Sequence, residues 1–317
     1  MTADAPPAAA RSPLAVDLCG VPLRGPLVAA AGTCGYVHEF DGVMDPRWLG
    51  AITTKSITRE SRDGNAPWRI LDTRAGMLNA IGLANVGLDA FLADKLRPAD
   101  TVIIGSIAGH SMDDYVTVAA AFDARPELPL VELNVSCPNT ATGRQFGSSP
   151  DALGELLAEV RPAVGSKPLI VKLSPEGDPV AMAAAAIEGG ADALTLINTM
   201  PAMAIDVESR TPRLSRGAGG LSGPAIHPVA VRIVHAVHRT VAADAGVPII
   251  GLGGVMDWRD AAELVLAGAT AVGMGTVLFV DPRAPKAINR GLERWVRRQG
   301  ATSIGELVGQ VDDRPRT

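Results

Sequence analysis

The stretch Leu128 to Asn139, LPLVELNVSCPN, decides how the fold of this chain is interpreted. Its first half is short, rich in Leu and Val and bounded by prolines, which is typical of a buried strand in a parallel sheet. Its second half places Cys137 between amide side chains and directly before a proline. Because parallel α/β proteins build their active sites at the carboxyl ends of strands, this second half is predicted to be a catalytic loop.

The rest of the chain repeats the pattern of a short apolar strand followed by a helix. Eight strands are expected, at Leu27 to Ala31, Ala51 to Ser56, Thr101 to Ile107, Leu128 to Leu133, Leu169 to Leu173, Ala193 to Ile197, Pro248 to Gly251 and Ala271 to Gly275. Helical patterns lie at Ala152 to Val164, Pro179 to Glu188, Val229 to Ala243, Asp257 to Ala267 and Pro285 to Gln299. Eight βα units predict an α/β fold, the (β/α)₈ TIM barrel. A doubly wound sheet is the alternative, but the glycine-rich dinucleotide turn after the first strand is missing.

Composition excludes several classes of protein. With 317 residues, 47% of them hydrophobic, the chain is long enough for one large α/β domain, expected over residues 14–317. A net charge of -5 and no arginine-rich stretch argue against nucleic acid as a partner. Three scattered cysteines without a C-x-x-C spacing predict no metal site and suit a reducing cytoplasm.

The first 13 residues are rich in Ala and Pro and lack the pattern of a signal peptide, so a disordered tail is expected there. No apolar stretch approaches the roughly 20 residues that span a bilayer, and no membrane partner is expected.

Two connections are longer than an ordinary βα loop, Ile57 to Gly87 and Asn198 to His227. Long loops in a compact domain are usually functional, and at the carboxyl end of a barrel they would be lids or substrate walls. The alternative is that they pack as irregular hairpins. After the last two strands, Gly253-Gly254 and Gly275-Thr276 can bring backbone N–H groups close to a ligand, which predicts a phosphate site.

Seven short motifs together resemble one known family, class 1 dihydroorotate dehydrogenase. Their order and spacing agree from about Leu14 to the end of the chain, and the resemblance is closest to the subclass that works with an iron–sulfur flavoprotein. The motifs are Lys55-Ser56, GMLNAIGL at Gly76 to Leu83, NVSCPN at Asn134 to Asn139, VKLS at Val171 to Ser174, INT at Ile197 to Thr199, GGLSGP at Gly219 to Pro224 and GLGGV at Gly251 to Val255.

The resemblance implies an FMN enzyme that oxidises dihydroorotate to orotate in pyrimidine synthesis. Cys137 would be the general base that removes the C5 proton, while a hydride leaves C6 for the flavin. A thiol suits this role because nearby donors can lower its pKa from the ordinary value of about 8.5. Cys19 and Cys34 are interpreted instead as buried, inert cysteines.

The resemblance also assigns roles to residues at the strand ends. Lys172 would face the flavin, and Lys55, implied with Cys137 as a catalytic residue, would bridge the flavin and the substrate carboxylate. On sequence grounds alone each lysine could instead reach solvent or pair with a carboxylate. The substrate residues implied are Lys55, Asn79, Ile81, Gly82, Leu83, Asn134, Asn139, Asn198 and Thr199. The cofactor residues implied are Ala31, Gly32, Lys55, Ser56, Ser106, Asn134, Lys172, Ile197, Gly223, Gly253, Gly254, Gly275 and Thr276.

The chain departs from the family pattern at a few positions near the flavin. Ala31 replaces a serine, and Ser106 stands where an asparagine is usual. Cys34 and Tyr36 replace the phenylalanine and the small or aromatic residue that the family usually has near the flavin. These differences bear on cofactor affinity and potential, and they leave open a flavin enzyme acting on another dihydropyrimidine. A barrel without redox activity that binds a phosphorylated metabolite is the third alternative.

The sequence does not name the electron acceptor. Fumarate, a quinone or a partner chain could each reoxidise the flavin. A homodimer is expected from the resemblance, with an FAD and iron–sulfur electron-transfer subunit as a further partner.

Overall fold

Eight parallel strands form a closed barrel in the computed structural model, which describes residues 12–136, 146–312 and 314. Each strand pairs with the next along the chain, and the last pairs with the first. The strands are β3 (Leu27–Ala29), β4 (Ala51–Thr53), β7 (Val102–Ile107), β8 (Leu130–Asn134), β9 (Leu169–Leu173), β10 (Ala193–Leu196), β15 (Ile249–Leu252) and β16 (Ala271–Met274). The predicted α/β barrel is confirmed, and each barrel strand overlaps the stretch expected for it.

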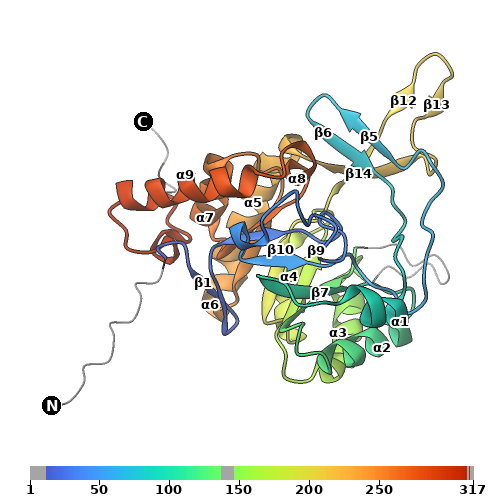
Figure 1. Ribbon diagram of the computed structural model, residues 1–317, viewed down its shortest axis with the longest axis horizontal. Helices are drawn as coiled ribbons and strands as arrows, with labels where there is room; N and C mark the ends of the chain where they lie inside the picture. The colour runs from blue at the N-terminus through green and yellow to red at the C-terminus, as the bar shows by residue number, and fades with distance from the viewer. Residues whose placement is uncertain (1–11, 137–145, 313, 315–317) are drawn as a thin grey trace.

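Helices cover the outside of the barrel (Figure 1). The longer ones are α2 (Met112–Asp123), α3 (Pro150–Val164), α4 (Pro179–Glu188), α5 (His227–Val237), α7 (Trp258–Ala267) and α9 (Ala284–Arg298). Short helices are α1 (Leu88–Ala90), α6 (Ala243–Ala245) and α8 (Val277–Val280), with π-helical segments at Phe91–Lys95 and His238–Ala242 and 3₁₀ turns at Pro46–Trp48, Pro224–Ile226 and Ile304–Leu307. Within the described ranges no helix is long and apolar enough to cross a membrane.

Local sequence signals fix several helix starts. Ser111 and Asp257 each form a capping box at the start of α2 and α7, and the Asp178 side chain accepts two backbone N–H groups at the start of α4. Such caps satisfy donors that the first turn of a helix leaves unpaired. All five residues of β9 are buried, because in a barrel one face of the strand meets the interior and the other meets the helices.

A short antiparallel hairpin closes the amino end of the barrel. It consists of β1 (Val16–Leu18) and β2 (Val21–Leu23), and sequence analysis did not predict it. Leu18 and Leu23 are buried and pack against an apolar layer inside the barrel. That layer comes from the first residues of the strands and consists of Val28, Ala51, Ile104, Leu130, Ile170, Ala193, Ile250 and Ala271.

The barrel interior becomes polar toward the carboxyl ends of the strands. Glu132, two residues after Leu130 on the same face of β8, is buried, and its Oε2 accepts a hydrogen bond of 2.8 Å from Thr195 Oγ1. Asn134 and Lys172 lie two residues further toward the carboxyl ends of β8 and β9 and are paired in register across the two strands. The polar side chains of the interior therefore lie at the carboxyl end of the barrel, where the cavity opens.

Both long connections join in one antiparallel sheet above the barrel (Figure 1). Its strand order is β11-β14-β6-β5, in which β5 (Ile70–Thr73) and β6 (Gly76–Asn79) come from the first connection and β11 (Met200–Met203) and β14 (Ala218–Ser222) from the second. The second connection also carries the hairpin of β12 (Ile205–Asp206) and β13 (Thr211–Pro212). The two loops are therefore not separate irregular hairpins.

Candidate active site

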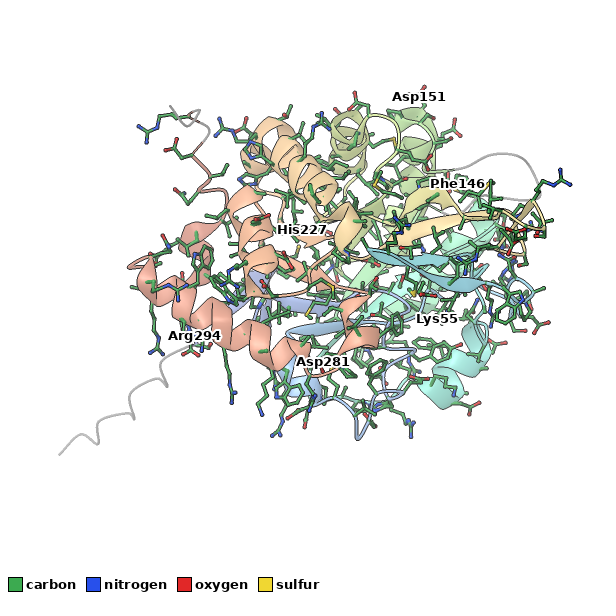
Figure 2. The ribbon with its side chains drawn as sticks, turned by 90° about the horizontal axis from the view of Figure 1, so that it is seen from above. Lys55, Phe146, Asp151, His227, Asp281 and Arg294 are labelled. Carbon is green, nitrogen blue, oxygen red and sulfur yellow. The ribbon has the colours of Figure 1, made fainter. Side chains whose placement is uncertain are left out.

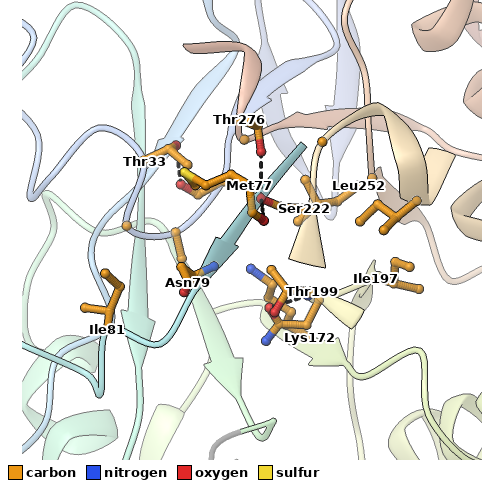
Figure 3. A pocket seen from close by; sticks show the side chains of 18 of the residues that line it. Thr33, Met77, Asn79, Ile81, Lys172, Ile197, Thr199, Ser222, Leu252 and Thr276 are labelled. Atoms are coloured by element: carbon orange, nitrogen blue, oxygen red, sulfur yellow. Dashed lines mark hydrogen bonds between the residues drawn. The ribbon is translucent and has the colours of Figure 1, made fainter. Parts of the chain in front are cut away.

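A cavity of about 520 Å³ lies between the barrel and this upper sheet. Its size is that of an ordinary pocket for a cofactor or small ligand. The barrel contributes residues at the carboxyl ends of its strands, and the upper sheet contributes Ile70, Met77 and Asn79 from one loop and Ser222 from the other. Figure 3 shows Asn79, Thr199 and Lys172 around the same space. The long loops thus form walls of the cavity, as one of the two interpretations predicted.

Glycines allow the two loops to meet closely above the cavity. Asn79 pairs with Gly220, and the Asn79 Nδ2 donates a hydrogen bond of 3.3 Å to the Gly220 carbonyl. A Cβ atom at Gly220 would collide with the Thr199 side chain, and one at Gly219 would collide with the Asn79 carbonyl. The Gly219-Gly220 pair is therefore a packing requirement of the upper sheet.

A chain of hydrogen bonds fixes the amide side chains on the cavity floor. Asn198 Nδ2 donates to Asn134 Oδ1 over 3.4 Å, and Asn134 Nδ2 donates to Ser56 Oγ over 3.3 Å. Ser56 Oγ is in turn 2.9 Å from Ser106 Oγ. Ser106 is fully buried and does not line the cavity, so it acts on the cavity through Ser56.

Two lysine side chains, Lys55 and Lys172, line the cavity. Lys172 is 5% exposed, and Lys55 is half-buried. Within the part of the chain that the structure describes, neither ammonium group has a carboxylate at ion-pair distance. Burial lowers the pKa of Lys55, and the nearby charge of Arg69 lowers it further. Because an unpaired buried ammonium costs several kcal/mol, this arrangement favours an anionic ligand.

The turns after the last two strands present free backbone donors. Gly253 and Gly254 adopt φ angles of 154° and 67°, in the region that favours glycine. Among the described residues, the N–H groups of Gly254, Gly275 and Thr276 have no hydrogen-bond acceptor. The Thr276 hydroxyl donates to Ser222 Oγ over 2.8 Å, which joins this corner to the upper sheet (Figure 3). A cluster of free N–H groups is a site for a phosphate group.

Comparisons with known proteins give the family. A family model described as dihydroorotate dehydrogenase matches residues 13–296. The catalytic subunit of dihydroorotate dehydrogenase B (NAD(+)) from Geotalea daltonii is 46% identical over 307 residues, which cover 95% of this chain and 99% of the relative. The chain belongs to the dihydroorotate dehydrogenase family. Members of this family are flavin-dependent oxidoreductases that convert dihydroorotate to orotate in pyrimidine biosynthesis.

Other relatives of the dihydroorotate dehydrogenase family differ in the acceptor their names give. The Pelobacter propionicus protein, also named as the catalytic subunit of the B (NAD(+)) enzyme, is 45% identical over 304 residues, covering 94% of this chain and 98% of the relative. A Solibacter usitatus protein is 43% identical with the same coverage and carries a provisional name, dihydroorotate dehydrogenase A (fumarate).

Most of the site residues expected from the dihydroorotate dehydrogenase resemblance line this one cavity. They are Ala31, Gly32, Lys55, Ser56, Asn79, Ile81, Leu83, Asn134, Lys172, Ile197, Asn198, Thr199, Gly223, Gly253, Gly254, Gly275 and Thr276. Gly82 and Ser106 do not line it. Cys137 and Asn139 lie outside the described residues.

Some lining residues were not expected from the sequence. Thr33, Ile70, Met77, Ser222, Leu252 and Phe279 are among them. Met77 and Ser222 lie inside the quoted motifs GMLNAIGL and GGLSGP. The motifs therefore identified the two loops but did not show which of their side chains face the cavity.

The two described cysteines are unsuited to proton transfer. Cys34 is fully buried, and burial raises the pKa of its thiol to about 12. Burial likewise raises the pKa of the Cys19 thiol to about 12, and Cys19 Sγ donates to the Asp192 carbonyl. Neither lines the cavity. The expected burial is confirmed for Cys34 but wrong for Cys19, which is only partly buried because it lies at the turn of the β1–β2 hairpin.

Proposed function

We propose that this chain oxidises (S)-dihydroorotate to orotate with FMN as its cofactor, in the pathway to UMP. The observation that carries the proposal is the buried ammonium of Lys172, which faces the cavity without an anionic partner in the described chain. A fixed cation at Lys172 would favour the reduction of a bound flavin, because reduction adds negative charge to the ring beside it. When bound, FMN supplies the hydride acceptor.

The residues present fit that cofactor. The free N–H groups of Gly254, Gly275 and Thr276 suit its phosphate, and Lys172 suits its ring. Ala31, Gly32 and Gly223 add backbone at other edges of the same cavity, and Gly223 has a φ of 96° that few other residues adopt. Backbone N–H groups and a lysine ammonium suit an anionic phosphate and ring, whereas a metal ion needs carboxylate, thiolate or imidazole ligands.

The substrate would lie under the upper sheet. Lys55 would bind its carboxylate, and the amide groups of Asn79, Asn134 and Asn198 would pair with its ring carbonyl and N–H groups. Because Asn134 Oδ1 already accepts from Asn198 and its Nδ2 already donates to Ser56, the orientation of this amide is set before substrate arrives. Such preorganisation lowers the cost of binding in a reactive pose.

Cys137 is proposed as the general base, three residues beyond Asn134 at the end of β8. Its thiolate would take the proton from C5, and the electron pair of that C5–H bond would form the C5–C6 double bond as a hydride leaves C6, for which a bound flavin would supply the acceptor. A thiol suits this proton transfer when its pKa lies near the pH at which the enzyme works.

We further propose that electrons pass to NAD⁺ through a partner subunit that carries FAD and an iron–sulfur cluster, with the chain itself a homodimer in the cytoplasm. Several relatives are named as catalytic subunits of the B (NAD(+)) enzyme, which supports a partner subunit and NAD⁺ as acceptor, while the FAD, the iron–sulfur cluster, the homodimer and the cytoplasm follow from the family resemblance. Ile70 and Phe279 line the cavity yet are 49% and 53% exposed, and are the surface that such a partner would cover.

The test is anaerobic mixing of the purified yellow protein with dihydroorotate while flavin absorbance is recorded. Bleaching supports the proposal, and dihydrouracil, which lacks the carboxylate that Lys55 would bind, is the matched control. Faster bleaching by dihydrouracil would instead support another dihydropyrimidine as substrate. A colourless protein that binds no added flavin would contradict the redox function altogether.

A further inference from the structure

A buried histidine, His227, stands behind the glycine turn of the cavity wall. It is the first residue of α5 and is 8% exposed (labelled in Figure 2). Its Nδ1 lies 2.7 Å from the Gly253 carbonyl oxygen, while its Nε2 lies 3.2 Å from Glu263 Oε2 on α7. His227 does not line the cavity, so none of the roles proposed above uses it.

The direction of the first hydrogen bond is settled by chemistry. A carbonyl oxygen can only accept, so Nδ1 of His227 carries a hydrogen and donates it to Gly253. At the other side of the ring, Nε2 faces two carboxylates of α7, Glu263 Oε2 at 3.2 Å and Asp260 Oδ1 at 3.8 Å, and it donates to Glu263 only when the ring carries a second hydrogen. The ring is thus fixed between α7 and the turn after β15.

This bond also sets the direction of an N–H group. In a trans peptide the C=O and the N–H of the same unit point in opposite directions. Because the Gly253 carbonyl points at His227, the N–H of Gly254 points away from His227. Gly254 lines the cavity, and its N–H has no acceptor in the described chain. The histidine therefore aims this donor at the cavity.

Among the described residues, the Gly253–Gly254 peptide makes no hydrogen bond other than the one to His227. Gly253 and Gly254 have no side chains, and Gly254 has a φ of 67°. A Cβ atom at Gly254 would lie 2.7 Å from the His227 Cβ and 2.8 Å from the Gly223 carbonyl oxygen, so the turn sits directly on the start of α5. A glycine pair can rotate its peptide plane easily, and the His227 bond removes that freedom.

We propose that His227 is a positioning residue for the phosphate monoester of the cofactor, which it serves by fixing the Gly253–Gly254 peptide so that the Gly254 N–H donates to the phosphate. This inference rests on the proposed flavin function. It assigns to His227 no contact with the cofactor itself.

Three variants and two flavins test the role. In His227→Asn the amide nitrogen can occupy the place of Nδ1, in His227→Gln it occupies the place of Nε2, and His227→Leu has neither donor. Dissociation constants of the flavin-free protein for FMN and for riboflavin, which lacks the phosphate, are measured by fluorescence quenching. We expect His227→Gln and His227→Leu to weaken FMN binding about tenfold, as for one bond to a charged group, and to leave riboflavin binding unchanged. His227→Asn should stay within about threefold of the parent.

Two results would overturn the inference. One is unchanged FMN affinity in His227→Gln and His227→Leu, and the other is an equal loss of FMN and riboflavin binding, which would mean a merely structural role. If thermal unfolding shows that His227→Leu does not fold, the Asn and Gln variants decide, and equal FMN affinities in those two refute the role. A parent protein that binds neither flavin contradicts the proposed function instead, so the two failures are distinguishable.

Discussion

The two ends of the barrel interior are built by the same strands but have opposite chemistry. On β8, Leu130 lies in the apolar layer that the β1–β2 hairpin covers, and Asn134, four residues later on the same face, lines the cavity. On β9, Ile170 and Lys172 make the same change within two residues. Since a strand advances about 3.3 Å per residue, stability and chemistry are separated by only about 7–13 Å. The comparison shows that one set of strands can form both a stabilising apolar core and a polar active site, because the inward side chains change from apolar to polar along each strand.

The largest effect is expected on the rate of flavin reduction, from a substitution in the loop after β8. Cys137→Ala should keep FMN and bind orotate but lose about 10²–10⁴-fold in the rate of flavin reduction, because a general base is worth that much. Stopped-flow absorbance with dihydroorotate measures this rate. Cys34→Ala is the matched control, since that thiol is fully buried outside the cavity, and it should reduce at the parental rate. Full activity in Cys137→Ala would remove the base from its proposed role.

An effect of similar free energy is expected at the amino end, but on stability alone. Leu130→Ala creates a cavity in the apolar layer and should cost about 2–5 kcal/mol of unfolding free energy. Urea denaturation measures the loss, and Leu18→Ala in the covering hairpin is the companion variant. The flavin reduction rate of the remaining folded protein should be unchanged. A comparable fall in that rate would break the separation between the two ends.

Lys55 tests the electrostatics of the cavity. Lys55→Met should weaken orotate binding about 10–100-fold, because the carboxylate loses its partner. Burial lowers the pKa of Lys55, so in the empty cavity the ammonium loses its proton at a lower pH than an exposed lysine does. Orotate affinity should therefore fall as the pH rises through that range.

Orotate titration of the flavin spectrum across pH measures both effects of Lys55. Lys55→Met should show low affinity without the alkaline fall, and Lys286→Met on α9 is a surface control that should behave like the parent. An unchanged pH profile in Lys55→Met would assign the carboxylate to another group.

The smallest expected effect concerns the buried hydrogen-bond chain. Ser106→Ala removes the partner of Ser56 Oγ and should weaken orotate binding by at most about fivefold, since one neutral hydrogen bond contributes about 1 kcal/mol. Isothermal titration with orotate measures it. Parental affinity in this variant would show that Ser56 holds Asn134 without help from β7.

Sequence reasoning found the barrel because its signals are local. Continuous apolar runs such as Leu169–Leu173 mark strands buried on both faces, and caps such as Asp178 mark helix starts. Most expected site residues also meet in one cavity, because parallel strands bring their carboxyl ends to one place.

What the sequence left out depends on distant contacts. The pairing of Asn79 with Gly220 joins residues far apart in the chain, so the upper sheet has no local pattern. The β1–β2 hairpin turns at Cys19 and Gly20, not at an Asn-Gly pair, and it escaped notice. Ser106 was expected at the cofactor but lies one hydrogen bond behind the cavity. His227 carried no local signal, since its partners are on other elements.

The upper sheet also limits how this enzyme can be redesigned. Strands β6 and β14 share a ladder, so the backbone of each long loop helps to keep the other in register. A chimaera that exchanges only one loop with a relative would pair mismatched edges, whereas transplanting both loops together would carry a complete unit. When parts are exchanged between related barrels, the two loops should therefore be transferred together as one unit.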